Sequence, residues 1–137
     1  MKLALQLEPS PEILERISQG VTDYAQEMRG LPPIEPFAIP LEDENGKLVG
    51  GCHGITYYGC IYMDALWIGE SHRHQGWGRQ LVQQMEAYGV RKGCTFATVN
   101  TMDWEALPFY EKLGYTIEFV RGGYPKNSKL YFLRNDF

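Results

Sequence analysis

Residues 66–81 decide the fold, and they read Leu-Trp-Ile-Gly-Glu-Ser-His-Arg-His-Gln-Gly-Trp-Gly-Arg-Gln-Leu. The apolar run through Ile68 predicts a buried strand, and the residues after Gly78 predict a helix that ends near Lys92. Glycines at 76 and 78 let the backbone approach a ligand, while the first helical N–H groups point outward with the positive end of the helix dipole. The segment therefore predicts a binding site for a phosphate group.

Two other phosphate motifs are excluded. A dinucleotide fingerprint needs a third glycine where Leu81 stands, and a Walker loop ends in Gly-Lys-Ser/Thr, which is absent here. Taken alone, a pair of loop glycines favours a purely structural strand-to-helix turn. The neighbouring segments therefore have to decide between the two interpretations.

Alternating and helical patterns predict an α/β (α+β) fold in one domain, residues 1–137, with a mixed sheet. The predicted strands are Met1–Leu7, Phe37–Glu42, Lys47–Tyr57, Cys60–Gly69, Cys94–Thr101, Tyr115–Arg121 and Ser128–Leu133. The predicted helices are Pro11–Met28, interrupted near Gly20, the helix that ends near Lys92, and Leu107–Leu113. The run Cys60–Gly69 is apolar at nearly every position, which is typical of a central strand covered on both faces.

The amino-acid composition limits the kinds of partner that this protein can bind. The formal net charge of -4 lacks the basic footprint that phosphate-backbone binding requires, so we expect no nucleic acid partner. Three cysteines without C-x-x-C spacing indicate neither a disulfide framework nor a zinc site, and we expect no metal. The apolar run at Leu3–Leu5 is too short for a signal peptide or a membrane span, so we expect a cytoplasmic protein without membrane contact.

Residues 47–135 resemble the GNAT superfamily of acetyl-coenzyme A-dependent N-acetyltransferases. The family motif R/Q-x-x-G-x-G/A corresponds to Arg73–Gly78, and Ala106–Tyr115 is similar to the second signature, A-x-x-F-Y-E-K-L-G-F. Residues 1–46 match the family in element order only. The resemblance implies a mostly antiparallel mixed sheet flanked by helices, with a splayed strand pair at the acetyl-coenzyme A site.

The resemblance also implies the cofactor contacts. The backbone of Leu66, Trp67 and Ile68 is expected to pair with the pantetheine arm and to polarise the thioester carbonyl. Asp103 stands where the family often has a cofactor-contacting asparagine; Asp103 is then a possible helix cap, and Asn100 is a candidate substitute. The whole set of expected cofactor-binding residues is Leu66, Trp67, Ile68, Arg73, His74, Gln75, Gly76, Trp77, Gly78, Arg79, Asn100 and Tyr110.

Acetyl transfer to an amine needs a proton donor for the departing thiolate and a base for the incoming ammonium. Tyr110 matches the family tyrosine near the sulfur and is the candidate general acid, although a short-helix aromatic is otherwise a core residue. Asp64, the lone charge of its strand, is the candidate base, with a structural hydrogen bond as the alternative. Tyr124, in the loop between the last strands, is the candidate substrate-binding residue.

The sequence thus predicts an N-acetyltransferase that moves an acetyl group from acetyl-coenzyme A to a primary amine of a small molecule or protein by direct attack. A homodimer is compatible with an exposed sheet edge. The alternative is a non-catalytic acyl-coenzyme A sensor, favoured by the departure at Asp103. A toxin-like enzyme acting on aminoacylated transfer RNA fits the negative charge poorly.

Overall fold

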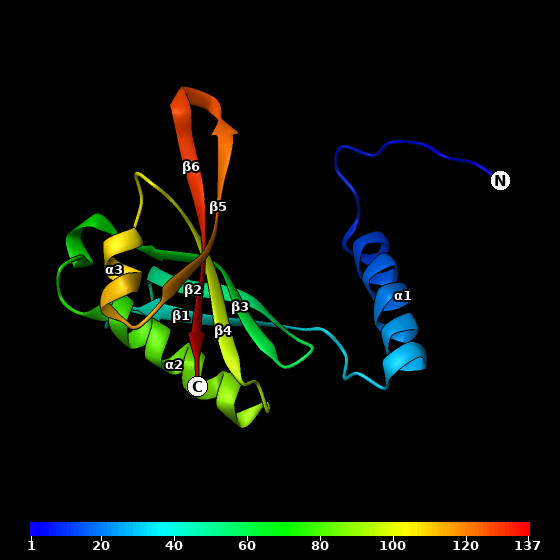
Figure 1. Cartoon of the computed structure of the whole chain (residues 1–137), viewed down its shortest axis with the longest axis horizontal. Helices are drawn as coiled ribbons and strands as arrows, with labels where there is room; N and C mark the ends of the chain where they lie inside the picture. The colour runs from blue at the N-terminus through cyan, green and yellow to red at the C-terminus, as the bar shows by residue number, and fades with distance from the viewer. The chain divides into compact units, whose positions relative to one another are not determined.

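The computed structural model describes all residues from Met1 to Phe137, in two units, residues 1–34 and residues 35–137. Residues 35–137 contain one six-stranded sheet in the order β1-β2-β3-β4-β6-β5 (Figure 1). Its strands are β1 (Glu35–Glu42), β2 (Leu48–Tyr57), β3 (Cys60–Ile68), β4 (Phe96–Met102), β5 (Thr116–Tyr124) and β6 (Ser128–Asp136). Only β3 and β4 run parallel, which confirms the mixed, mostly antiparallel sheet.

One face of this sheet carries both helices of the unit, α2 (Trp77–Arg91) and α3 (Leu107–Lys112) (Figure 1). The core between them is apolar and includes Leu81, Val82 and Met85 of α2, which are buried as their helical spacing predicts. Tyr110 of α3 joins the same core. The helices are therefore anchored by the face of the sheet that carries Ile61 and Met63.

Within residues 35–137 no helix lies on the opposite face of β3, and the prediction that both faces of this strand are covered stays a prediction. Asp64, Ala65 and Trp67 are exposed, whereas Ile61 and Met63 are buried. A continuous apolar run is compatible with two covered faces, but helix placement decides which faces are covered, and neither α2 nor α3 lies on this one.

Two prolines, Pro36 and Pro40, lie within the strand β1. β1 is an edge strand that pairs only with β2, so a missing N–H on its outer side breaks no ladder bond. A hairpin joins β1 to β2. Asp43 closes it, since its Oδ1 accepts hydrogen bonds from the backbone N–H groups of Asn45 and Lys47.

In residues 1–34, the helix α1 spans Pro11–Arg29 without a break. The Ser10 side chain caps its start, and Gly30 ends it with a φ of 64°. The predicted interruption at Gly20 is wrong, because a single helical glycine costs only about 1 kcal/mol against its neighbours' preference. The predicted strand Met1–Leu7 is also wrong: these residues are exposed and form no strand.

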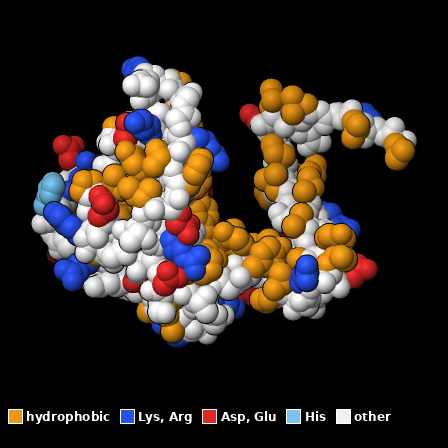
Figure 2. All heavy atoms as spheres, viewed as in Figure 1, with side chains coloured by type: hydrophobic (Ala, Val, Ile, Leu, Met, Phe, Trp, Pro, Cys, Tyr) orange, Lys and Arg blue, Asp and Glu red, His pale blue; other side chains and the backbone are white.

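The apolar stripe of α1 is not buried as its spacing suggests. Ile17 and Val21 are more than half exposed, and hydrophobic side chains are visible along the helix in Figure 2. Thr22 is the buried residue of the helix. Residues 1–34 thus contain an amphipathic helix whose stripe finds no core within its own unit.

Candidate active site

The turn between β3 and α2 is held by two side chains of the predicted motif. The Arg73 Nε donates a hydrogen bond to the carbonyl of Ile68 at 2.9 Å, and the Gln75 amide donates to the carbonyl of Ser71 at 3.2 Å. A short 3-10 turn, Glu70–His72, lies between these contacts. Arg73 and Gln75 therefore fasten the turn to the end of the strand.

The start of α2 presents unpaired backbone donors. Gly76 precedes the helix with a φ of 85°, a left-handed conformation that glycine adopts without strain. No side chain caps this end, and Gln80 is the first residue whose N–H bonds back, to the carbonyl of Gly76 at 3.1 Å. The N–H groups of residues 77–79 are left open at the positive end of the helix dipole, where an anion is favoured.

These donors open into a groove of about 780 Å³. The groove runs from the end of β3, over the turn, to the start of α3. Its lining residues are Leu66, Trp67, Ile68, His72, Arg73, His74, Gly76, Trp77, Gly78, Arg79, Glu105, Ala106 and Phe109.

Nine of the expected cofactor residues thus line one groove, whereas Gln75, Asn100 and Tyr110 do not. The groove also includes four residues that the sequence did not predict there: His72, Glu105, Ala106 and Phe109. Ala106 and Phe109 belong to the second motif, so that motif was the signal for them. Gly78 explains the contact between the motifs, since a Cβ there would lie 3.2 Å from the Phe109 ring.

β3 has a free edge beside this groove. Its parallel pairing with β4 covers only Cys60–Met63 against Phe96–Val99. Residues 66–68 pair with β2 on the other side, for example Leu66 with Cys52. The backbone of β3 beyond Met63 therefore has no strand partner on the side of β4.

Tyr110 is buried in the core, with only 6% of its surface exposed. Its hydroxyl has no hydrogen-bond partner in the protein, and the Phe109 ring packs against it edge-on at 5.0 Å. Burial, followed by the negative charge of Glu105 and the Cys52 thiol, raises the pKa of Tyr110 well above its ordinary value near 10. The phenol thus keeps its proton at neutral pH, as a general acid must.

Asp64 lies at a β-bulge rather than in a buried strand centre. The β2–β3 register shifts between His53, which pairs with Ala65, and Gly54, which pairs with Met63, so Asp64 has no partner across the ladder. Its side chain is 60% exposed. Exposure removes the desolvation argument that singled out this residue, but it leaves the carboxylate accessible.

A chain of polar side chains leads to Asp64 on the face of the sheet opposite α2 and α3. Asn100 donates to the Tyr62 hydroxyl at 3.5 Å, and Tyr62 donates to the Asp64 Oδ1 at 3.3 Å. The His53 Nδ1 lies 3.9 Å from the Asp64 Oδ2. Asn100, Tyr62, Asp64 and His53, here named the polar chain, connect β4, β3 and β2.

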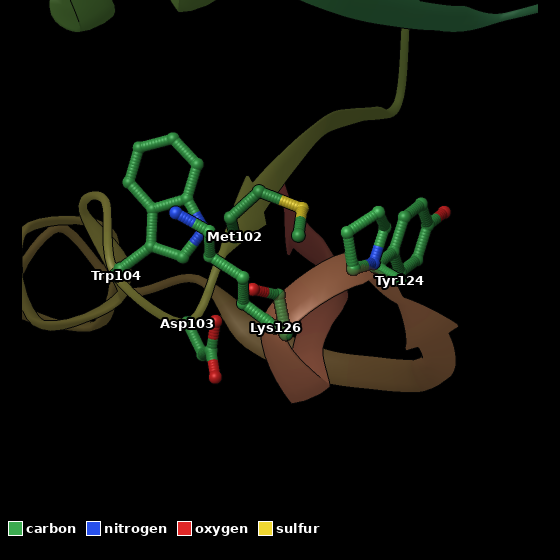
Figure 3. Close-up of a pocket in the computed structure, with 7 residues that line it drawn as sticks. Met102, Asp103, Trp104, Tyr124 and Lys126 are labelled. Atoms are coloured by element: carbon green, nitrogen blue, oxygen red, sulfur yellow. The ribbon is translucent and has the colours of Figure 1, made fainter.

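Tyr124 lines a separate pocket of about 670 Å³ between the end of β4 and the 3-10 turn Pro125–Asn127. Figure 3 shows Trp104 and Tyr124 on opposite sides of this pocket, with Lys126 between them. Asp103 also lines it. Asp103 does not cap α3: the Glu105 carboxylate accepts from the N–H of Met102, and the Thr101 hydroxyl accepts from the N–H of Ala106.

The three cysteines are buried, and burial raises the pKa of the Cys52 thiol to about 11. A buried thiol of raised pKa is a poor nucleophile, which fits direct attack better than a covalent enzyme intermediate. His, Cys, Asp and Glu side chains form no group of three or more that could hold a metal ion. None of the helices has the length and apolar character needed to cross a membrane.

Comparison with known proteins identifies the class of enzyme. The family model of the "Acetyltransferase (GNAT) family" matches residues 5–115, so the chain belongs to this family. Blasticidin-S acetyltransferase from Streptomyces morookaense is 32% identical over 94 residues, which cover 68% of this chain and 69% of the relative. The chain is therefore an acetyl-coenzyme A-dependent N-acyltransferase.

Two solved structures resemble this chain over nearly its whole length. A crystal structure of an acetyltransferase from Bacillus cereus has a TM-score of 0.79, 28% identity and 98% coverage of both chains. A crystal structure from Agrobacterium tumefaciens, also assigned to the acetyltransferases, has a TM-score of 0.85 and 25% identity, and each chain is covered completely. The order of elements is thus shared from one end of the chain to the other.

Proposed function

We propose that this enzyme transfers the acetyl group of acetyl-coenzyme A to a primary amine of a small molecule by direct attack. The observation that carries the proposal is the groove that joins the open N–H groups of residues 77–79 to the free edge of β3. In addition, the Tyr110 hydroxyl makes no hydrogen bond to another group of the protein. Blasticidin-S acetyltransferase, by its name, acts on a small molecule, which favours a small-molecule acceptor over a protein.

The donor set at the start of α2 fits a diphosphate. Three backbone N–H groups and the Arg79 guanidinium provide charge and directed donors, while Gly76 and Gly78 keep the approach free of side chains. Arg73 is already bonded to Ile68, so its role is to hold the turn in shape. These residues bind and orient the cosubstrate.

The free edge of β3 provides backbone groups for the acetyl-transfer step. Its backbone groups at Leu66–Ile68 are available to the pantetheine arm and to the thioester carbonyl, whose oxygen gains negative charge as the amine attacks. Tyr110 gives its proton to the departing sulfur, and the raised pKa keeps that proton in place until then. Asp64, through the polar chain, takes the proton of the acceptor ammonium or passes it to water.

The test is an assay of free thiol release from acetyl-coenzyme A with a panel of amines, beside calorimetry with coenzyme A. Amine-dependent thiol release with coenzyme A affinity supports the proposal. Affinity without amine-dependent release would instead favour a sensor of acyl-coenzyme A. Absence of affinity at millimolar coenzyme A would refute both. A cytoplasmic location and a homodimer belong to the same proposal, and light scattering checks the second.

A further inference from the structure

The groove at the start of α2 is lined by a single acidic side chain, that of Glu105. Two cationic residues of the lining, Arg73 and Arg79, come from the turn before α2 and from α2 itself. Glu105 belongs instead to the loop that leads from β4 into α3, just before Leu107 begins the helix. The charge of the groove therefore changes sign between the turn and the start of α3.

The Glu105 carboxylate has no cationic partner within residues 35–137, because none of their salt bridges includes it. Acetyl-coenzyme A, the cosubstrate of the family, cannot provide one, since its charged groups at neutral pH are phosphates. A carboxylate without a cation repels such a ligand. A positively charged group of the acceptor is therefore the partner that fits Glu105.

The backbone of Met102 holds the Glu105 side chain in position. The Oε1 of Glu105 accepts a hydrogen bond from the N–H of Met102 at 3.0 Å, and the N–H of Glu105 donates to the Met102 carbonyl, also at 3.0 Å. No donor of residues 35–137 bonds to the Oε2. One oxygen thus fixes the carboxylate, and the other is free to accept a hydrogen bond from a substrate.

Glu105 also acts on the candidate general acid. Its negative charge contributes, after burial, to the raised pKa of Tyr110. The N–H of Tyr110 donates to the carbonyl of Ala106, the residue after Glu105, at 3.2 Å. A cation bound to Glu105 therefore lies at the same end of the groove as the helix that carries Tyr110.

We propose that Glu105 binds the ammonium of the acceptor through its free Oε2, and that the enzyme favours alkylamines, which arrive as cations, over uncharged nitrogen nucleophiles. This inference rests on the proposed function and names a substrate-binding residue and a substrate class for it. The proton leaves the ammonium afterwards, to Asp64 or to water.

Two nucleophiles of equal length, butylamine and propanohydrazide, test the role of the charge with saturating acetyl-coenzyme A. Butylamine is a cation at neutral pH, whereas propanohydrazide is uncharged. Glu105→Gln should lower kcat/KM for butylamine about 10- to 100-fold, mainly through KM, and should change kcat/KM for propanohydrazide by less than about twofold. An equal loss with both nucleophiles would overturn the inference, because a purely structural role does not depend on the charge of the substrate.

The same variant separates cation binding from the tie to Met102. Glutamine keeps an oxygen that accepts the N–H of Met102, so thermal unfolding of Glu105→Gln should match the wild type, whereas Glu105→Ala should be less stable. Calorimetry should show coenzyme A affinity unchanged or higher in Glu105→Gln, since a negative charge leaves the groove. A loss of affinity of about tenfold or more would assign Glu105 to the cosubstrate and overturn the inference.

Glu111→Gln is the matched control, because it removes the same charge from an exposed position of α3 that does not line the groove. It should leave kcat/KM unchanged with both nucleophiles. Equal turnover of butylamine by the wild type and by Glu105→Gln would refute the role of Glu105 and leave the proposed function standing. Absence of turnover with butylamine and with every other amine of the panel would refute both.

Discussion

Gly54 of β2 lies directly against the backbone carbonyl of Tyr62 in β3, so closely that a Cβ on residue 54 would overlap the carbonyl oxygen. This contact stands next to the register shift that leaves Asp64 without a ladder partner. A bare glycine thus permits the bulge that turns Asp64 and the neighbouring Ala65 to the same face of the sheet, opposite α2 and α3.

The contact predicts that Gly54→Ala forces β2 and β3 apart. We expect a loss of about 1–3 kcal/mol in the free energy of unfolding, because the obstacle is backbone and not a flexible side chain. Urea unfolding measures this loss in the free energy of unfolding. Gly122→Ala is the control, since a Cβ there meets no atom within 4 Å. Equal stability of the two variants would contradict the close approach.

The open N–H groups of residues 77–79 predict a specific effect of Gly76→Glu on coenzyme A affinity. The added carboxylate would enter the space in front of the open N–H groups and repel the diphosphate, so we expect Kd to rise about tenfold or more. Calorimetry measures this change. Gly93→Glu is a matched control, because Gly93 has a φ of 83° against 85° for Gly76 and both Cβ positions are open. An equal loss of affinity in both variants would point to backbone strain alone.

Tyr110→Phe should lower kcat about 10- to 1,000-fold and leave coenzyme A affinity within a factor of about two, because only the proton donor is lost. Steady-state kinetics and calorimetry separate these effects. Tyr115→Phe serves as comparison: this buried phenol donates to Glu86 at 2.8 Å and contacts no groove, so its loss should reduce stability and spare kcat. An unchanged kcat in Tyr110→Phe, with chemistry limiting the rate, would remove Tyr110 from the mechanism.

Alkaline pH should destabilise the fold through its buried phenols. Burial and the Glu86 carboxylate raise the pKa of Tyr115 above its unfolded value near 10. Above about pH 10 the unfolded chain releases this proton while the folded chain retains it, so stability is present below the unfolded pKa and falls as pH rises, by about 1.4 kcal/mol per pH unit for one group.

Urea unfolding between pH 10 and 11 tests this prediction. The wild type should lose stability more steeply than Tyr115→Phe, whereas below pH 9 the two slopes should match. Tyr110 and the Cys52 thiol, whose pKa values are also raised by burial, add to the slope in both proteins and therefore cancel in the comparison. Identical slopes above pH 10 would show that Tyr115 titrates as an exposed phenol.

Local patterns predicted the strand, the turn and the helix that begin in residues 66–81. They succeeded because their causes lie within a few residues: Gly76 needs a positive φ, and Leu81, Val82 and Met85 recur at helical spacing. The second motif placed Phe109 in the same groove, since the ring needs the bare backbone at Gly78.

The predictions that failed concern residues whose structure depends on partners distant in the sequence. Met1–Leu7 alternates as a strand does, yet a strand exists only where another strand accepts its hydrogen bonds, and pairing is not a local property. Asp64 looked like a buried charge because its neighbours are apolar, whereas the register shift leaves it without a ladder partner and its side chain is 60% exposed.

By itself, the sequence determined the family, the turn before α2 and the residues that form its open donors, because glycine conformation and helical periodicity act over short distances. The tertiary structure alone decided that α2 and α3 share one face of the sheet and that Asn100, Tyr62, Asp64 and His53 lie side by side. These side chains come from three strands, and the register between the strands brings Asn100 to the Tyr62 hydroxyl and the His53 Nδ1 to 3.9 Å from the Asp64 Oδ2.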